Sequence, residues 1–340
     1  MNYLCLFKRI SATILVLSIV QFSDAQQNSP IGTNLETIDY PYPTRYLTLA
    51  IQGESLKMAY MEVIPTTPNG ETVLLMHGKN FNGAYWEQTA NDLAAKGYRV
   101  VIPDQIGFGK SSKPNRIQYS FQLLALNTKQ LLDSLRIGKA HILGHSMGGM
   151  LATRFALMFP AYTQTLILEN PIGLEDWKTV VPYQTVENWY KSELAQTYDK
   201  IKNYQLTFYY DNKWKPQYDR WVHMLAGWTH DIDYPRIAWN SALLYDMIFT
   251  QPVVYEFGNI QSPTLLIIGQ RDRTALGKAL APKEVQKTLG NYPLLGRRAA
   301  EAIPDAQLVE IDGIGHLPHI EAYDQFIRPL IAFLKAHSSN

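Results

Sequence analysis

The chain has 340 residues, of which 46% are hydrophobic and 18% are charged. This length is sufficient for one large α/β domain or two small domains, and neither arrangement needs disulfides or metals to bury a core. The 31 Lys and Arg residues nearly balance the 30 Asp and Glu residues, so the formal net charge of +1 gives no basis for nucleic-acid binding. The hydrophobic fraction excludes a disordered chain.

Residues 1–25 have the pattern of a secretory signal peptide. Two basic residues precede the apolar segment Ile10–Val20, and Ser23 and Ala25 are small residues at the positions that signal peptidase requires. The apolar segment is about half as long as a transmembrane helix. We therefore expect cleavage after Ala25, a secreted or periplasmic protein, and no membrane span in the mature chain.

The single cysteine, Cys5, lies within this predicted signal peptide. The mature protein then has no disulfide, no thiolate metal site and no cysteine nucleophile. Any nucleophile must be an oxygen or a nitrogen.

Beyond about Tyr42, patterns typical of strands and helices alternate. Residues Tyr46–Ile51 and Leu56–Ile64 flank Gly53-Glu54 and predict an antiparallel hairpin. Six further strands are predicted from short apolar runs at 72–76, 98–102, 140–143, 165–168, 264–268 and 307–311. Helices are predicted at 85–96, 121–135, 147–159 and 321–336, with Gly97 and Gly138 as stop signals for the first two. This order predicts an α/β protein with a mainly parallel, doubly wound, eight-stranded sheet.

Residues 172–260 interrupt the alternation. Their helical pattern is irregular, and they hold six of the seven Trp residues. We expect an inserted helical lid that divides the core into residues 26–171 and 261–340, with most of the aromatic side chains packed inside the lid. Residues 273–298 are interpreted as an unusually long loop without an assigned role.

The segment Gly144-His145-Ser146-Met147-Gly148 has the form G-x-S-x-G. It lies between a predicted strand and a predicted helix, the position in which a sharp turn exposes a nucleophilic serine at the sheet edge. The following helix N-terminus directs its amides and its dipole toward developing negative charge. Ser146 is therefore the predicted nucleophile.

A serine nucleophile requires a base and an orienting acid. Asp272 and His316 each follow a predicted strand, and the chain order Ser146, Asp272, His316 is the order that this architecture uses. Glu169 follows another strand and is the alternative acid. For the oxyanion hole, the backbone amides of Met147 and Lys79 are predicted, and the Lys79 side chain is interpreted as solvated in preference to a substrate contact.

Five segments carry a resemblance to a known family. They are His77-Gly78, Pro103–Ser112, Gly144–Gly149, Gly269–Asp272 and Gly315–Glu321. Over essentially all of the mature sequence the chain resembles the α/β-hydrolase fold superfamily. The resemblance implies a Ser-His-Asp hydrolase that forms an acyl-enzyme, with a lid inserted after the sixth strand. It also implies that His77, Asp104 and Glu321 orient loops.

Departures from members of that superfamily narrow the chemistry. Epoxide hydrolases and haloalkane dehalogenases carry Asp where Ser146 stands, and carbon–carbon bond hydrolases typically have Asn and Trp where this chain has His145 and Leu317. The sequence GHSMGG resembles esterases, lactonases and perhydrolases.

The leading hypothesis is a serine hydrolase that cleaves a carboxylic ester or lactone of a small to medium, apolar or aromatic substrate. It needs no cofactor and no metal, and its partner is a small molecule. One alternative is amide or peptide cleavage, since Glu175, Asp176, Asp231 and Asp233 offer acids for a substrate amine. The other is a binding protein on the same scaffold. No feature of the sequence fixes the oligomeric state.

Overall fold

The computed structural model describes residues 30–338. The predicted signal peptide, residues 1–25, lies outside the described residues, and its cleavage stays a prediction. Between residues 30 and 338, no helix is both long and apolar enough to cross a membrane.

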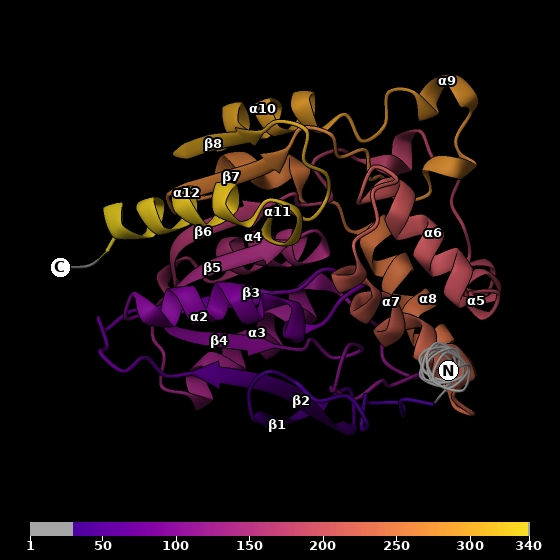
Figure 1. Ribbon diagram of the computed structural model, residues 1–340, viewed down its shortest axis with the longest axis horizontal. Coiled ribbons are helices and arrows are strands. Elements are labelled where there is room, and N and C mark those ends of the chain that lie inside the picture. The colour runs from indigo at the N-terminus through magenta and orange to yellow at the C-terminus, as the bar shows by residue number, and fades with distance from the viewer. Residues whose placement is uncertain (1–29, 339–340) are drawn as a thin grey trace, which may run out of the picture.

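An eight-stranded sheet forms the centre of the molecule (Figure 1). Its strands are β1 (Thr44–Ile51), β2 (Glu54–Val63), β3 (Thr72–Met76), β4 (Arg99–Pro103), β5 (Ala140–His145), β6 (Thr163–Glu169), β7 (Thr264–Gly269) and β8 (Ala306–Ile311). The spatial order is β1-β2-β4-β3-β5-β6-β7-β8. Strands β1 and β2 form the predicted hairpin, β2 pairs with β4 in the antiparallel sense, and the remaining neighbours are parallel. The predicted sheet is confirmed.

Helices cover both faces of the sheet. They are α2 (Glu87–Ala95), α3 (Phe121–Ser134), α4 (Met147–Met158), α10 (Tyr292–Ala302), α11 (Pro318–Glu321) and α12 (Tyr323–Ala336). Alternate residues of one strand enter opposite cores: Leu74 and Met76 of β3 pack with α3, α4 and α10, whereas Val73 and Leu75 pack with α2 and α12. Because both faces are buried, the central strands are continuous apolar runs.

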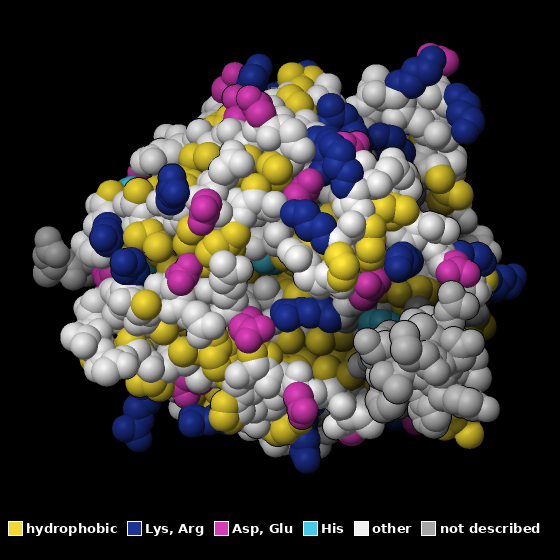
Figure 2. Space-filling view, viewed as in Figure 1, with side chains coloured by type: hydrophobic (Ala, Val, Ile, Leu, Met, Phe, Trp, Pro, Cys, Tyr) yellow, Lys and Arg dark blue, Asp and Glu magenta, His cyan; other side chains and the backbone are white. Residues whose placement is uncertain are grey.

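The segment between β6 and β7, residues 170–263, is here called the helical insert. It contains the α-helices α5 (Val186–Leu194), α6 (Tyr198–Phe208), α7 (Asp219–Ala226) and α8 (Tyr234–Thr250), together with shorter 3₁₀ helices. Figure 1 places these four helices together at one end of the sheet. Figure 2 shows acidic and basic side chains interspersed over both the core and the insert, as the near-zero net charge leads one to expect.

Two expectations about elements are wrong. Residues 273–298 are not one long loop, because they contain the short helix α9 (Lys283–Gln286) and the first part of α10. Gly138 does not end α3. That helix ends at Ser134, and Arg136 adopts the left-handed conformation (φ 57°) that reverses the chain there.

Candidate active site

Ser146 occupies the sharp turn between β5 and α4. Its backbone has φ 57° and ψ −121°, a region that residues with a side chain rarely adopt. The turn is possible because its neighbours are glycines: a Cβ on Gly144 would lie 2.0 Å from the Gly148 carbonyl oxygen, and a Cβ on Gly148 would lie 2.3 Å from the Met76 carbonyl oxygen. The close approach of α4 to β3 and β5 thus requires both glycines and places Ser146 at the carboxyl end of β5.

His316 and Asp272 meet Ser146 at this edge of the sheet. His316 Nε2 lies 2.9 Å from Ser146 Oγ, and His316 Nδ1 lies 2.6 Å from Asp272 Oδ2. The loops after β7 and β8 carry Asp272 and His316, and both side chains are buried. The structure therefore brings the three predicted residues into one hydrogen-bonded chain.

Two further groups hold the Asp272 carboxylate, and sequence reasoning missed both. Asn170 Nδ2 donates to Oδ2 over 2.9 Å, and the Thr274 amide donates to Oδ1 over 2.8 Å. Burial favours the neutral carboxyl, but the imidazole of His316 and the hydrogen bonds from Thr274 outweigh it, so the pKa of Asp272 is lowered. Asp272 is therefore an anion that fixes one ring nitrogen of His316 as a donor.

Glu169, the alternative acid, is directed away from His316. Its Oε1 accepts the His319 amide and lies 2.8 Å from His319 Nδ1. Burial raises the pKa of Glu169 to about 7. Of the two candidate acids, the structure places Asp272 on the imidazole of His316.

A buried histidine next to the serine supports the His316 loop. His145 Nε2 donates to the His316 carbonyl oxygen over 2.7 Å, and His145 Nδ1 lies 3.0 Å from Tyr85 Oη. Burial lowers the pKa of His145 to about 3, so the ring is neutral and accepts the Tyr85 hydroxyl proton at Nδ1. His145 and Tyr85 were not predicted site residues. The available signal for His145 is a histidine directly before the predicted nucleophile, in a strand whose only other charged or polar side chain is His141.

Three residues were expected to orient loops, namely His77, Asp104 and Glu321. Each accepts a hydrogen bond from a backbone amide. His77 Nε2 accepts the Gln105 amide, and Asp104 accepts the Gly83 and Lys110 amides. Glu321 accepts the Gly315 amide through one oxygen and Arg271 through the other, at 2.9 and 2.5 Å. Glu321 thus ties together the residues that precede His316 and Asp272.

The loop after β3 passes directly beside Ser146. A Cβ on Gly78 would lie 3.0 Å from the Ser146 Cβ. The Gly78 amide donates to Tyr85 Oη, and the Phe81 amide donates to the Gly78 carbonyl oxygen. The other two amides of this loop segment belong to Lys79 and Asn80, which lie between Gly78 and Phe81. Met147 is the first residue of α4, where helical amides have no partner within the helix. The oxyanion-hole role of the Met147 and Lys79 amides stays a prediction.

The interpretation of the Lys79 side chain as solvated is wrong. Lys79 Nζ donates to Ser241 Oγ over 2.8 Å and lies 3.5 Å from the centre of the Tyr245 ring, both on α8. The side chain is partly buried, and desolvation lowers its pKa. Its ammonium therefore lies between the core and the helical insert.

The helical insert covers the histidine of this site. Tyr209 stacks on His316, with ring centres 5.0 Å apart and planes at 22°, and its hydroxyl accepts Asn80 Nδ2 over 3.0 Å. A cavity of about 20 Å³ lies between the loop after β3 and α7. Its walls include Lys79, Phe81, Phe108, Trp221, Met224 and Trp228. In this conformation the cavity holds about one water molecule.

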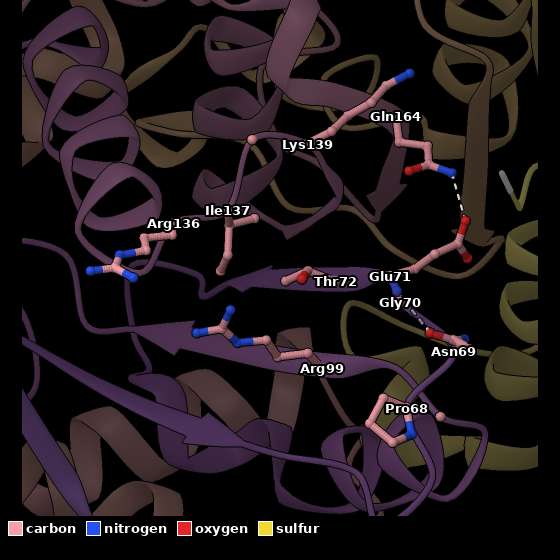
Figure 3. A pocket seen from close by; sticks show the side chains of 12 residues that line it. Pro68, Asn69, Gly70, Glu71, Thr72, Arg99, Arg136, Ile137, Lys139 and Gln164 are labelled. Atoms are coloured by element: carbon pink, nitrogen blue, oxygen red, sulfur yellow. Dashed lines mark hydrogen bonds between the residues drawn. The ribbon is translucent and has the colours of Figure 1, made fainter.

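A larger, open hollow of about 490 Å³ lies on the side of the sheet opposite Ser146, where the parallel strands begin (Figure 3). Residues at the amino ends of the parallel strands line it, including Thr72, Arg99 and Gln164. Ligands of open α/β sheets bind at the carboxyl ends of the strands, which is where Ser146 lies. Within residues 30–338, no group of three or more His, Cys, Asp or Glu side chains is arranged to hold a metal ion.

Comparison with known proteins finds a matching family model and a similar known structure. The sequence model of the α/β hydrolase fold matches residues 71–207. A probable hydrolytic enzyme of known structure from Pseudomonas aeruginosa PAO1 is 52% identical, with a TM-score of 0.89, over 91% of this chain and 99% of that chain.

Two curated relatives differ in their reactions. Lipase 3 of Moraxella sp. (strain TA144) is 28% identical over 93% of this chain and 94% of the lipase. The 2-hydroxy-6-oxononadienedioate/2-hydroxy-6-oxononatrienedioate hydrolase of Comamonas testosteroni is 27% identical over 78% of this chain and 88% of that enzyme.

Proposed function

Since the chain belongs to the α/β hydrolase fold superfamily and is a hydrolase, we propose that it is a serine hydrolase that cleaves a carboxylic ester or lactone. The observation that carries the proposal is the hydrogen-bonded chain from Ser146 through His316 to Asp272, at 2.9 and 2.6 Å. Serine becomes nucleophilic only beside such an oriented base.

The proposed reaction has two halves. Ser146 Oγ attacks the ester carbonyl carbon while His316 Nε2 accepts the serine proton, and the Met147 and Lys79 amides stabilise the resulting oxyanion. The C–O bond to the leaving alcohol then breaks, His316 returns the proton to that oxygen, and the acyl group stays on Ser146. A water molecule attacks the acyl-enzyme by the same sequence of proton transfers and releases the acid.

The walls of the cavity favour an apolar or aromatic substrate of small to medium size. Phe81, Phe108, Trp221 and Trp228 present aromatic surface between the core and the insert. We propose that the insert acts as a lid, because Tyr209 covers His316 and the cavity holds only about one water molecule in this conformation.

The alternative of amide cleavage has less support. The four acids that were candidates for holding a substrate amine accept hydrogen bonds within the protein: Glu175 from the Gly290 amide, Asp176 from the Lys178 amide, Asp231 from the Asp233 amide, and Asp233 from the Thr33 hydroxyl. The binding-protein alternative does not require the complete chain of Ser146, His316 and Asp272. Carbon–carbon bond cleavage is disfavoured by the departures at His145 and Leu317.

A substrate panel tests the proposal. We expect hydrolysis of p-nitrophenyl esters of short to medium chain length, slower hydrolysis of long-chain esters, and no rate increase at a lipid–water interface. Aminoacyl p-nitroanilides serve as the amide comparison, and the variant Ser146→Ala serves as the inactive control. Faster amide than ester cleavage, or activation by a triglyceride emulsion with poor turnover of butyrate esters, would overturn this substrate assignment.

We also propose that the protein is exported, on the basis of the pattern in residues 1–25. Mass spectrometry of the protein from its native host should find a mature chain that begins at Gln26 in the periplasm or medium. An intact chain beginning at Met1 in the cytoplasm would contradict this proposal.

A further inference from the structure

A buried hydrogen-bonded bridge joins the loop after β3 to the loop that carries His316. The Gly78 amide donates to Tyr85 Oη over 2.9 Å. Tyr85 Oη lies 3.0 Å from His145 Nδ1, and His145 Nε2 lies 2.7 Å from the His316 carbonyl oxygen. Both bridging side chains are buried. The two loops that lie on either side of Ser146 are thus connected through only two side chains.

The protons of this bridge have one arrangement that satisfies every group. A carbonyl oxygen can only accept, so the neutral His145 ring carries its proton on Nε2 and leaves Nδ1 as the acceptor. Tyr85 then donates its hydroxyl proton to Nδ1 while its oxygen accepts the Gly78 amide. Burial holds the pKa of the Tyr85 hydroxyl well above its usual range, and the nearby Glu169 carboxyl adds to this effect, so the hydroxyl keeps its proton. All donors of the bridge therefore point from Gly78 toward His316.

The bridge fixes the peptide group on one side of Gly78, and two further contacts fix the peptide group on the other side. The Gly78 carbonyl oxygen accepts the Phe81 amide over 3.2 Å and lies 2.9 Å from His77 Nδ1. A trans peptide is planar, and its N–H points opposite to its C=O. The contacts of the Gly78 carbonyl therefore also set the direction of the Lys79 amide, which is the proposed oxyanion donor from this loop.

The bridge passes directly beside the proposed nucleophile. His145 precedes Ser146 in the chain, and a Cβ on Gly78 would lie 3.0 Å from both His145 Nδ1 and the Ser146 Cβ. Only a residue without a side chain permits this approach. The loop after β3, the His145 ring and Ser146 are packed so closely that a shift of one displaces the others.

From these contacts we infer that Tyr85 and His145 are positioning residues for the proposed ester hydrolysis. They set the Lys79 amide and the His316 imidazole relative to each other. This inference rests on the proposed function and adds two residues to its machinery. The developing oxyanion needs the amide while the proton transfer needs the imidazole, so both groups must be in place in the same transition state.

Tyr85→Phe tests the inference, because it removes the hydroxyl and keeps the ring. That ring stacks on Phe81 with centres 4.9 Å apart and packs edge-on against His319 at 4.6 Å. We expect kcat on p-nitrophenyl butyrate to fall about 10- to 100-fold, as a displacement on the order of 1 Å produces, with KM changed by less than about threefold.

A transition-state analogue gives a second readout for the same variant. Propyl trifluoromethyl ketone carries the butyryl chain and would form a hemiketal on Ser146, whose oxyanion occupies the place of the one in the reaction. Its inhibition constant should rise by about the same factor as kcat falls. A loss of stability alone would change neither kcat nor this constant in the folded protein.

His145→Gln interrupts the same bridge at its other residue. The Gln amide nitrogen can take the place of Nε2 and still donate to the His316 carbonyl oxygen, but it leaves no acceptor where Nδ1 stood. We again expect kcat to fall about 10- to 100-fold with little change in KM. In the double variant the two losses should not add, because either change alone already breaks the bridge. Each single variant decides the test if the other does not fold.

Tyr162→Phe is the control variant. Tyr162 directly precedes β6, at the end of the sheet opposite Ser146, and its hydroxyl donates to Asp133 Oδ1 of α3 over 2.7 Å. The substitution removes a hydrogen-bonded tyrosine hydroxyl outside the bridge, and it should leave kcat, KM and the inhibition constant unchanged. Thermal unfolding of every variant measures its stability.

The outcomes separate the inference from the proposed function. Unchanged kcat and ketone affinity in folded Tyr85→Phe or His145→Gln would overturn the inference. A loss in kcat/KM that lies entirely in KM would also overturn it, and so would losses that add in the double variant. A wild type that does not hydrolyse p-nitrophenyl butyrate would refute the proposed function itself.

Discussion

In the proposed mechanism Ser146 acts only as one member of a hydrogen-bonded unit, so its loss and the loss of His316 should have similar effects. Replacing either Ser146 or His316 by Ala is expected to lower kcat by roughly 10⁴-fold or more. The fold should persist, because neither change adds atoms, and in His316→Ala the buried Asp272 carboxylate keeps its hydrogen bonds from Asn170 and the Thr274 amide. Steady-state kinetics on p-nitrophenyl butyrate together with thermal unfolding measures both effects. Near-normal turnover in Ser146→Ala would refute the mechanism.

The choice of acid is tested by two neutral isosteres. Asp272→Asn removes the carboxylate that accepts a hydrogen bond from His316 Nδ1 and so keeps the proton on that nitrogen. We therefore expect kcat to fall about 10³- to 10⁴-fold. Glu169→Gln keeps an oxygen for the His319 amide, so its kcat should change less than about tenfold. A larger loss in Glu169→Gln than in Asp272→Asn would reverse the assignment.

At the scale of single residues, the sequence predicted the groups that are linked by a motif. Ser146, Asp272 and His316 were predicted because each follows a strand in a fixed chain order. Asn170 and Tyr209 were missed because their contacts join segments far apart in the chain. The environment of Lys79 was predicted wrongly for the same reason, since it is set by α8, 162 residues away.

At the scale of the element, the turn between β5 and α4 depends on close backbone contact. Gly148→Ala would place a Cβ 2.3 Å from the Met76 carbonyl oxygen and 2.7 Å from that of His77. Because α4 would have to shift away from β3, we expect a loss of about 1–3 kcal/mol in the free energy of unfolding, and a loss of activity.

Gly138→Ala is the matched control for that substitution. A Cβ at Gly138 meets no atom within 4 Å, so the change should be neutral or stabilise by up to about 1 kcal/mol. Urea unfolding of both variants gives the comparison. Equal stability of Gly148→Ala and Gly138→Ala would show that the turn tolerates a larger residue.

Elements that follow a regular pattern were predictable, and those set by packing were not. The apolar runs of the eight strands were sufficient to find the sheet. Helix α10 was missed because Gly296 in its interior is a poor helix former, and because Pro293 was taken as a break although proline is tolerated in the first turn of a helix. Packing explains the glycine, since a Cβ at Gly296 would lie 3.0 Å from Ile268 of β7.

At the scale of the whole molecule, the buried Glu169 makes stability depend on pH. Its pKa is raised from 4.5 to about 7 in the folded protein, so between these values the folded state holds a proton that the unfolded chain has released. The contribution of Glu169 to the free energy of unfolding is therefore fully present below about pH 4.5, and it is lost as the pH rises through 7. Glu169→Gln cannot ionise and should avoid this loss.

Chemical unfolding of wild type and Glu169→Gln near pH 5 and pH 8 checks this expectation. Relative to wild type, the variant should gain on the order of 2 kcal/mol between the two conditions. His319 is present in both proteins, so its own titration contributes to both. A variant that loses stability relative to wild type as the pH rises would show that Glu169 is ionised in the folded protein.

The central claim is that Ser146 is the nucleophile, and reaction with a fluorophosphonate tests it most directly. Intact-mass and peptide analysis should find a single adduct on Ser146, formed slowly in His316→Ala and absent in Ser146→Ala. A folded wild-type protein that forms no adduct, or that carries the adduct on another residue, would contradict the account.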